Sequence, residues 1–262
     1  MGAPEPEEIY ERTRDEGARR LERPLSEVAS TAVAAGFDIM AGVVTLVLLE
    51  SQLSHLLGTQ AAHVVGSVGF GIGFVFLIVG RGELFTENFL VPLAGLDGKE
   101  RNAWWKVAEL WTVSPVFNVA AGAFMGFLLS VHSVLPYGTG QAVAKTAETI
   151  YANGTLARFV SAIFAGALIT AMTWFIEGQT SVGMRVTIGW IAGAILALGS
   201  FNHVIVVTLE LIFGIRFGAH IPWSFVLGNF ALAAAGNMIG GIGLVTLNRF
   251  TQARSSGNTA SG

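Results

Sequence analysis

The chain has 262 residues, of which 52% are hydrophobic and only 13% charged, with a mean hydropathy of +0.61 and a formal net charge of −3. Soluble domains carry about 25% charged residues, so the composition excludes an ordinary soluble protein and indicates an integral membrane protein. The chain has no cysteine, which excludes disulfides, zinc–thiolate sites and cysteine nucleophiles.

The N-terminal segment differs from the rest of the chain. Residues 4–24, PEPEEIYERTRDEGARRLERP, are dense in charge. They contain no short apolar stretch ahead of a small-residue cleavage site, so this is not a secretory signal peptide. We expect residues 1–28 to form a helical segment in the cytoplasm, with a disordered tail as the alternative.

Six long apolar stretches follow. A membrane span needs about 20 mostly apolar residues to cross a hydrocarbon core of about 30 Å. The candidate spans are residues 30–52, 60–94, 107–131, 157–177, 184–214 and 221–248. We therefore expect a transmembrane domain over residues 29–249. The small polar residues 250–262 are expected to be disordered.

Two of these stretches are too long for one simple span, and both are interrupted. The second stretch breaks at RGE (81–83), and the fifth breaks at SFN (200–202). Backbone groups freed at membrane depth must be buried in protein or line a wet cavity, because lipid offers no hydrogen-bond partner. Paired breaks in two halves of three spans each predict inverted repeats with a transport site between them.

The halves resemble each other beyond the breaks. Thr86 precedes Asn118 by 32 residues, and His203 precedes Asn237 by 34. With the N-terminus inside, most Lys and Arg residues fall on the cytoplasmic side, and only Lys145, Arg158 and Arg216 fall outside. The positive-inside rule therefore places both termini in the cytoplasm.

Three motifs carry a family resemblance. GELFTENF (82–89), SFNH (200–203) and GNMIGG (236–241), in this order and spacing, resemble the formate/nitrite transporter family over residues 30–248. The resemblance implies an all-α, aquaporin-like membrane protein with six transmembrane helices in a 3+3 inverted repeat, helices 2 and 5 being broken. It also implies a homopentamer in the inner membrane, with one pore per protomer, that passes small monovalent anions or weak acids, often with a proton.

The resemblance also implies which residues line the pathway. The pore histidine falls on His203, and the loop at the first break falls on Leu84, Phe85 and Thr86. The complete expected set is His203, Thr86, Phe85, Leu84, Phe74, Leu196, Asn202, Asn237 and Asn118, in which Phe74 with Leu84 and Phe85 with Leu196 form the two hydrophobic constrictions.

Several positions depart from the formate-channel pattern. Asn202 stands where those channels have Glu, Gly166 where they have Asn, and Leu196 where they have Phe. Ile150 aligns with a vestibule lysine, for which Lys145 or Arg158 could substitute. These departures resemble the YfdC-type inner-membrane branch of the family.

Five additional charged residues lie in or near the apolar stretches. These are Arg81, Glu83, Asp38, Glu87 and Glu210. We expect a buried charge network in which Arg81 pairs with Glu83, Asp38 or Glu87, and spacing alone does not choose among the three.

The barrier to transport suggests how such a pore works. Moving a bare carboxylate through an apolar ring costs several kcal/mol even after relaxation. Protonating an acid with a pKa near 4 costs about 4 kcal/mol at pH 7, so the neutral form is favoured. We expect Thr86 to donate a hydrogen bond to the permeant and His203 to supply a proton or a hydrogen bond. The alternative is that His203 only fastens the second break.

Other function classes have little support in the residues. His203 has no His or Asp at helical spacing, as a metal site would require, and no HExxH, GxSxG or Walker A motif occurs. We therefore expect no enzyme activity, no metal, no cofactor and no nucleic-acid partner. A non-conducting scaffold or sensor of the same fold is the alternative to a transporter.

Overall fold

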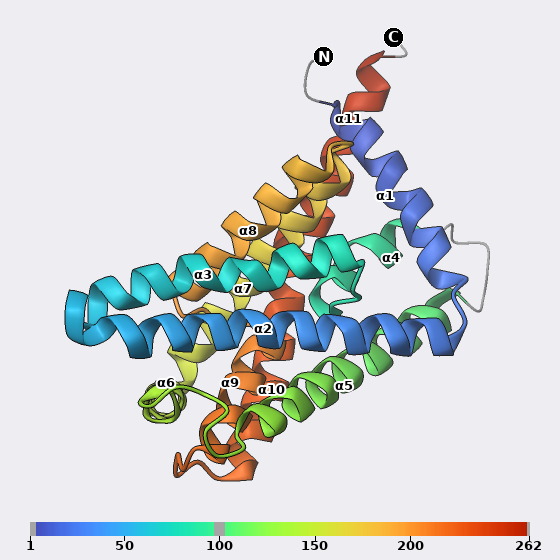
Figure 1. The fold of residues 1–262 in the computed structure, drawn as a ribbon. Helices are drawn as coiled ribbons and strands as arrows, with labels where there is room; N and C mark the ends of the chain where they lie inside the picture. The colour runs from blue at the N-terminus through green and yellow to red at the C-terminus, as the bar shows by residue number, and fades with distance from the viewer. Residues whose placement is uncertain (1–3, 97–102, 261–262) are drawn as a thin grey trace.

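The computed structural model describes residues 4–96 and 103–260, and all of its regular elements are helical (Figure 1). In chain order they are α1 (Pro6–Leu21), α2 (Leu25–Leu57), α3 (Thr59–Gly80), the 3₁₀ turn η1 (Phe85–Phe89), α4 (Val91–Ala94), α5 (Ala103–Leu129), α6 (Thr139–Ala152), α7 (Thr155–Glu177), α8 (Val182–Leu198), α9 (Val204–Arg216), α10 (Trp223–Met238), the π-helical η2 (Ile239–Thr246) and α11 (Leu247–Ala260).

These helices form six membrane spans. Helices α2, α3, α5, α7 and the continuous α10–η2–α11 are each long and apolar enough to cross a bilayer, and α8 is a shorter apolar helix. The second span is α3 followed by η1 and α4, and the fifth is α8 followed by α9. The fold is therefore the six-helix inverted repeat with broken second and fifth helices, as predicted.

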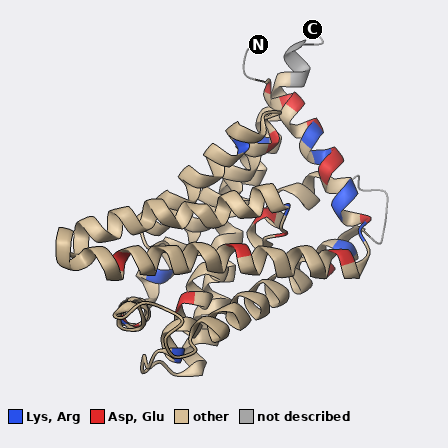
Figure 2. Ribbon diagram, in the orientation of Figure 1, with Lys and Arg blue, Asp and Glu red and all other residues tan. Residues whose placement is uncertain are grey.

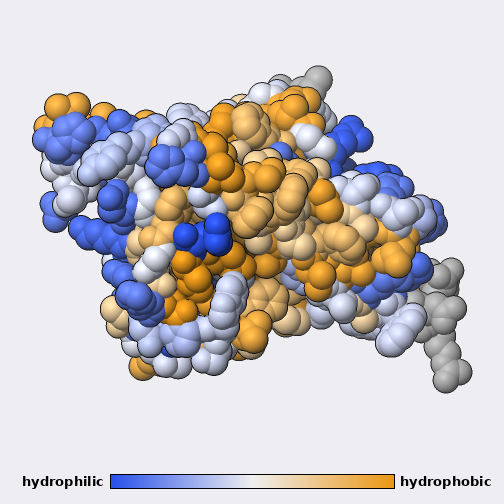
Figure 3. Space-filling view, turned by 60° about the horizontal axis from the view of Figure 1, so that its bottom comes forward, coloured by the Kyte–Doolittle hydropathy of each residue, from blue (hydrophilic) through white to orange (hydrophobic). Residues whose placement is uncertain are grey.

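The surface is consistent with this arrangement. Charged residues are dense on α1 and sparse along the bodies of the long helices (Figure 2). In Figure 3, hydrophobic side chains cover the middle of the visible face, with hydrophilic residues at its two ends. Large apolar side chains such as Phe124 and Leu227 are more than half exposed, as expected for surfaces that face lipid or another apolar partner.

The first and last helices lie together. Helix α1 packs against α11, where the rings of Tyr10 and Phe250 meet edge to face at 5.0 Å and Ala253 is buried. The segment expected to be disordered from residue 250 is therefore helical as far as Ala260. Phe250 and Ala253 pack in one cluster with Ile9 and Tyr10 of α1, a tertiary contact that the polar composition of the segment does not reveal.

Candidate functional site

The first break has a defined backbone geometry. Helix α3 ends at Gly80, and the next residue, Arg81, adopts the left-handed conformation with φ 53°. The N–H of Arg81 donates to the carbonyl of Ile78, and that of Gly82 donates to Leu77. These bonds satisfy the last carbonyls of the helix, as in a Schellman motif. The chain then runs extended to η1.

The second break repeats this geometry 119 residues later. Ser200 is left-handed with φ 47°, and its N–H donates to the carbonyl of Ala197. The N–H of Phe201 donates to Leu196, the counterpart of Leu77. Helices α3 and α8 thus end in the same way. Each is followed by a residue other than glycine with positive φ, which is uncommon.

A buried asparagine fastens each break to the neighbouring span. Asn118 of α5 accepts a hydrogen bond from the N–H of Phe85 (3.1 Å) and donates to the carbonyls of Ala32 and Glu83 (2.8 and 2.9 Å). Its side chain is fully buried. Both amide hydrogens and the amide oxygen are therefore used by backbone groups.

Asn237 of α10 does the same at the second break. It accepts from the N–H of Val204 (2.9 Å) and donates to the carbonyls of Ala162 and Asn202 (2.7 and 3.1 Å). The true spacing is 33 residues in both halves, from Phe85 to Asn118 and from Val204 to Asn237. Thr86 and His203, which lie 32 and 34 residues before the two asparagines, are therefore not equivalent positions in the two halves.

Glycines allow these asparagines to approach so closely. A β-carbon on Gly36 would collide with the backbone carbonyl of Asn118, and one on Gly166 would collide with the backbone of Asn237. Glycine at 166, where formate channels have asparagine, therefore has a packing reason in this chain. It leaves room for α10 against α7.

Thr86 and His203 come together where the two breaks meet. The Oγ1 of Thr86 lies 2.8 Å from the Nε2 of His203, and both side chains are fully buried. The Nδ1 of His203 accepts from the N–H of Val206 at 3.4 Å, so the imidazole caps α9. A neutral ring with Nδ1 as acceptor carries its hydrogen on Nε2, which then donates to Thr86.

This assignment leaves one hydrogen unused. The Thr86 hydroxyl accepts from His203, and its own O–H has no other hydrogen-bond partner among the described residues. A hydroxyl can donate while it accepts. The arrangement therefore presents one hydrogen-bond donor in an apolar setting.

The four residues expected at the constrictions are all buried. Phe74, Leu84, Phe85 and Leu196 are all at most 4% exposed and belong to one apolar cluster. Phe85 also meets the ring of Phe89 at 5.0 Å. The four residues expected at the constrictions thus share one apolar cluster, which also contains Val204 and Val206 of α9.

A cavity of about 500 Å³ lies on one side of this core, between α2, α3, α6, α8 and α9. Its lining includes Leu196 and Val206 as well as Lys145, Ile150 and Glu210. Lys145, one of the two candidates for the vestibule lysine, is therefore at the cavity.

The other candidate, Arg158, supports the second break instead. Its Nη1 donates to the Oδ1 of Asn229 at 2.9 Å, and it is absent from the lining of the cavity. Asn229 in turn exchanges two hydrogen bonds with Asn202, at 3.1 and 3.2 Å. Asn202 is held by this amide pair, a contact that sequence reasoning missed.

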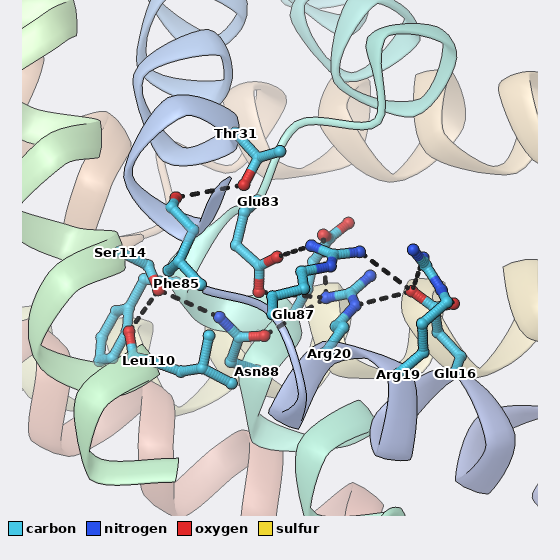
Figure 4. Close-up of polar contacts among 12 residues, drawn as sticks. Glu16, Arg19, Arg20, Thr31, Glu83, Phe85, Glu87, Asn88, Leu110 and Ser114 are labelled. Carbon is cyan, nitrogen blue, oxygen red and sulfur yellow. Dashed lines mark hydrogen bonds and ion pairs between the residues drawn. The ribbon is translucent and has the colours of Figure 1, made fainter. Parts of the chain in front are cut away.

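The charge network near the first break differs from the predicted one. The carboxylate of Glu83, 1% exposed, pairs with Arg23 at 2.6 Å and Arg20 at 3.6 Å (Figure 4). Glu87 lies 3.9 Å from Arg20. Arg81 is exposed and forms no ion pair among the described residues, so the expectation that it pairs with Glu83, Asp38 or Glu87 was wrong.

The partners come from the N-terminal segment, which sequence reasoning had treated separately. Helix α1 crosses α4 with Gly17 against Val91 and Gly95, and this contact brings Arg20 to the first break. Arg20 also donates to the side chain of Asn88 at 3.3 Å. The signal was the closely spaced arginines before Pro24, but their distant acidic partners cannot be read from spacing.

The remaining predicted charges lie apart from this network. Asp38 has one buried oxygen, Oδ2, without a hydrogen-bond partner among the described residues. Glu210 lies at the cavity on the opposite side of the core. The five charges therefore do not form one network.

Comparisons with known proteins identify the fold's relatives. A model of the formate/nitrite transporter family matches residues 7–251. The chain belongs to this family. It is 25% identical over 250 residues to the inner membrane protein YfdC of Escherichia coli (strain K12), covering 94% of this chain and 78% of that protein. The resemblance to the formate/nitrite transporter family is thereby confirmed, and YfdC is one of the relatives.

Two further family members carry a functional description. The formate channel BtFdhC of Bacillus thuringiensis is 23% identical over 257 residues, 94% of each chain. A solved pentameric formate channel with formate bound superposes with a TM-score of 0.73 at 19% identity, covering 87% of this chain and 96% of that one. This likeness shows that the chain has the fold of the family's channels.

Proposed function

We propose that the chain conducts small monovalent weak acids, of the formate or nitrite type, through one pore in each protomer of a homopentamer. The observation that carries this proposal is the buried Thr86–His203 pair at the meeting of two helix breaks. Relatives described as a formate channel and as a pentameric formate channel support the substrate class and the assembly. We place the protein in the inner membrane, with both termini in the cytoplasm.

Within this pore, Thr86 is the group that contacts the permeant. Its free O–H donates to an oxygen of the acid, while His203 holds the hydroxyl in that orientation through Nε2. Because Nδ1 of His203 accepts from the Val206 N–H, the ring acts as a neutral hydrogen-bond donor. The geometry favours this role over that of a proton donor.

The apolar residues of the pore determine which protonation form of the acid crosses it. Phe74, Leu84, Phe85 and Leu196 belong to one apolar cluster, and an apolar constriction built from them would penalise a bare anion by several kcal/mol. A neutral acid avoids this penalty, so we propose that a proton travels with each anion. Asn118, Asn237 and Asn202 position the breaks through their backbone and amide bonds.

Flux into proteoliposomes tests the proposal. Formate, nitrite and acetate are supplied with and without an inward pH gradient, and empty liposomes give the background. We expect uptake above background that increases with the gradient. Uptake equal to that of empty liposomes for all three would favour a non-conducting scaffold or sensor.

A further inference from the structure

The guanidinium of Arg158, in the first turn of α7, is held in one orientation although it forms no ion pair with another described residue. Its Nε donates to the carbonyl of Asn153 (3.1 Å), its Nη1 to the side chain of Asn229 (2.9 Å) and its Nη2 to that of Thr155 (3.2 Å). Its Cζ lies over the ring of Phe225, 4.5 Å from the ring centroid. A rigid planar fork of donors is a property of arginine that lysine does not share.

Arg158 sets the orientation of two buried amides. Because a guanidinium only donates hydrogen bonds, the atom of Asn229 that faces Nη1 must be its oxygen, Oδ1. The Nδ2 of Asn229 then donates to the Oδ1 of Asn202 at 3.1 Å, and the Nδ2 of Asn202 donates back to the Oδ1 of Asn229 at 3.2 Å. A turned Asn229 amide would set its N–H groups against those of Arg158. The arginine therefore fixes which way both amides point.

Asn202 passes this constraint to the next residue, His203. Its backbone N–H donates to the Oγ of Ser161 at 2.9 Å, and its carbonyl accepts from the Nδ2 of Asn237 at 3.1 Å. Its side-chain Nδ2 also donates to the carbonyl of Arg158 at 3.2 Å. Every polar group of Asn202 has a partner, so the peptide that leads into His203 cannot rotate without breaking a hydrogen bond.

The position of His203 determines whether its ring reaches Thr86. The Nε2 of His203 and the Oγ1 of Thr86 lie 2.8 Å apart, and both side chains are fully buried. A displacement of about 1 Å would take this contact out of hydrogen-bonding range. The hydroxyl would then lose the partner that orients it.

The first break is held in a related way. Glu83 is the counterpart of Asn202, since each residue comes directly before a counterpart pair of the two halves. Glu83 pairs with Arg23 at 2.6 Å. Each break is therefore held by an arginine at the same position of the repeat. At the second break the contact is indirect, because the amide of Asn229 lies between Arg158 and Asn202.

We propose that Arg158 and Asn229 are positioning residues of the pore, which act through Asn202 to hold His203 where its Nε2 orients the Thr86 hydroxyl. The proposal rests on the proposed function, in which that hydroxyl contacts the permeant. Arg158 and Asn229 are absent from the lining of the cavity. They act through Asn202 and not on the acid itself.

A double-mutant cycle of formate uptake by proteoliposomes tests the proposal. Asn229→Ala removes the partner of Asn202, and Thr86→Val removes the hydroxyl that is positioned. We expect Asn229→Ala to lower uptake about tenfold when Thr86 is present, as for a misplaced reacting group. In the Thr86→Val background it should lower uptake little further, because coupled sites are not additive. An equal fold-loss in both backgrounds would indicate a general structural role and overturn the proposal.

Arg158→Lys is a second variant, since lysine keeps the charge and loses the fork. Its matched control is Arg216→Lys, because Arg216 also lies over a phenylalanine ring, 5.1 Å from that of Phe127, and donates to Ser130. We expect Arg158→Lys to lose uptake with the same coupling to Thr86→Val, and Arg216→Lys to match wild type. Variants are compared only if they elute as the wild-type oligomer, and either Asn229→Ala or Arg158→Lys suffices.

The ring of His203 reports its own position without transport. In protein that contains histidine labelled with nitrogen-15, the ring resonances of His203 are assigned by their absence in His203→Gln. They should shift in Asn229→Ala and Arg158→Lys and stay in place in Arg216→Lys. Unchanged resonances would overturn the positioning role even if uptake falls. Wild-type protein without any uptake would overturn the proposed function, and the resonances would still decide the positioning role.

Discussion

At the scale of single residues, Asn118 and Asn237 are the groups that make helix breaks tolerable at membrane depth. Each amide satisfies three backbone groups that lipid would leave without partners. The sequence drew attention to both residues as polar positions on a pathway. The structure shows their amides turned to the backbone, a distinction that depends on side-chain direction and that spacing does not contain.

Replacement of either amide should therefore lower stability. In Asn237→Ala the N–H of Val204 and two carbonyls lose their partner, and an unsatisfied buried group costs about 1–3 kcal/mol. We expect a lower thermal unfolding midpoint in detergent for Asn118→Ala and Asn237→Ala. Thr112→Ala is the control, since Thr112 is exposed and bonds only within its own helix. Unchanged midpoints in both asparagine variants would refute the fastening role.

At the scale of elements, α1 is fastened across the first break and is not a separate tail. Its Arg20 meets Glu83 and Glu87, and its Gly17 packs on Gly95. Composition predicted a helical N-terminal segment, and α1 is such a helix. Its docking could not be predicted, because charge density at one end of the chain does not identify a partner 60 residues away.

Removal of the shared carboxylate should release α1. Glu83→Gln leaves Arg20 and Arg23 buried near the break without their main counter-charge, which costs about 3 kcal/mol when a buried pair is broken. We expect faster protease cleavage between α1 and α2. Asp15→Asn serves as control, because Asp15 forms only an exposed pair with Arg14. Equal cleavage rates in Glu83→Gln and wild type would show that the ion pairs do not hold α1.

Acid should loosen the same helix. Burial by itself raises the pKa of Glu16, but Arg20 and Arg19 outweigh it and lower the pKa below the usual value of 4.5. The stabilisation is therefore complete above pH 4.5 and is lost as the pH falls through the lowered pKa. Protease protection of α1 should decline in this range and decline less in Glu16→Gln. An identical decline in that variant would assign the effect to other groups.

At the scale of the whole molecule, two interrupted apolar stretches were enough to predict six spans and an inverted repeat. This prediction succeeded because backbone N–H and C=O groups exposed to lipid find no hydrogen-bond partner there. The register of the repeat was off by one residue in each half, since Thr86 and His203 meet each other without being symmetry-related. Leu84 is the counterpart of His203, so one half contributes an imidazole and the other an apolar side chain.

In the proposed function, this asymmetry leaves one donor hydroxyl in an apolar pathway, and we expect transport to depend on that hydroxyl. The most direct measurement is formate uptake by proteoliposomes of wild type, Thr86→Ser and Thr86→Val. Serine keeps the hydroxyl, and valine keeps the shape without it. We predict near-wild-type uptake for serine and a loss of about tenfold for valine, as for one hydrogen bond of about 1.4 kcal/mol. Wild-type uptake by Thr86→Val, in protein that assembles normally, would contradict the account.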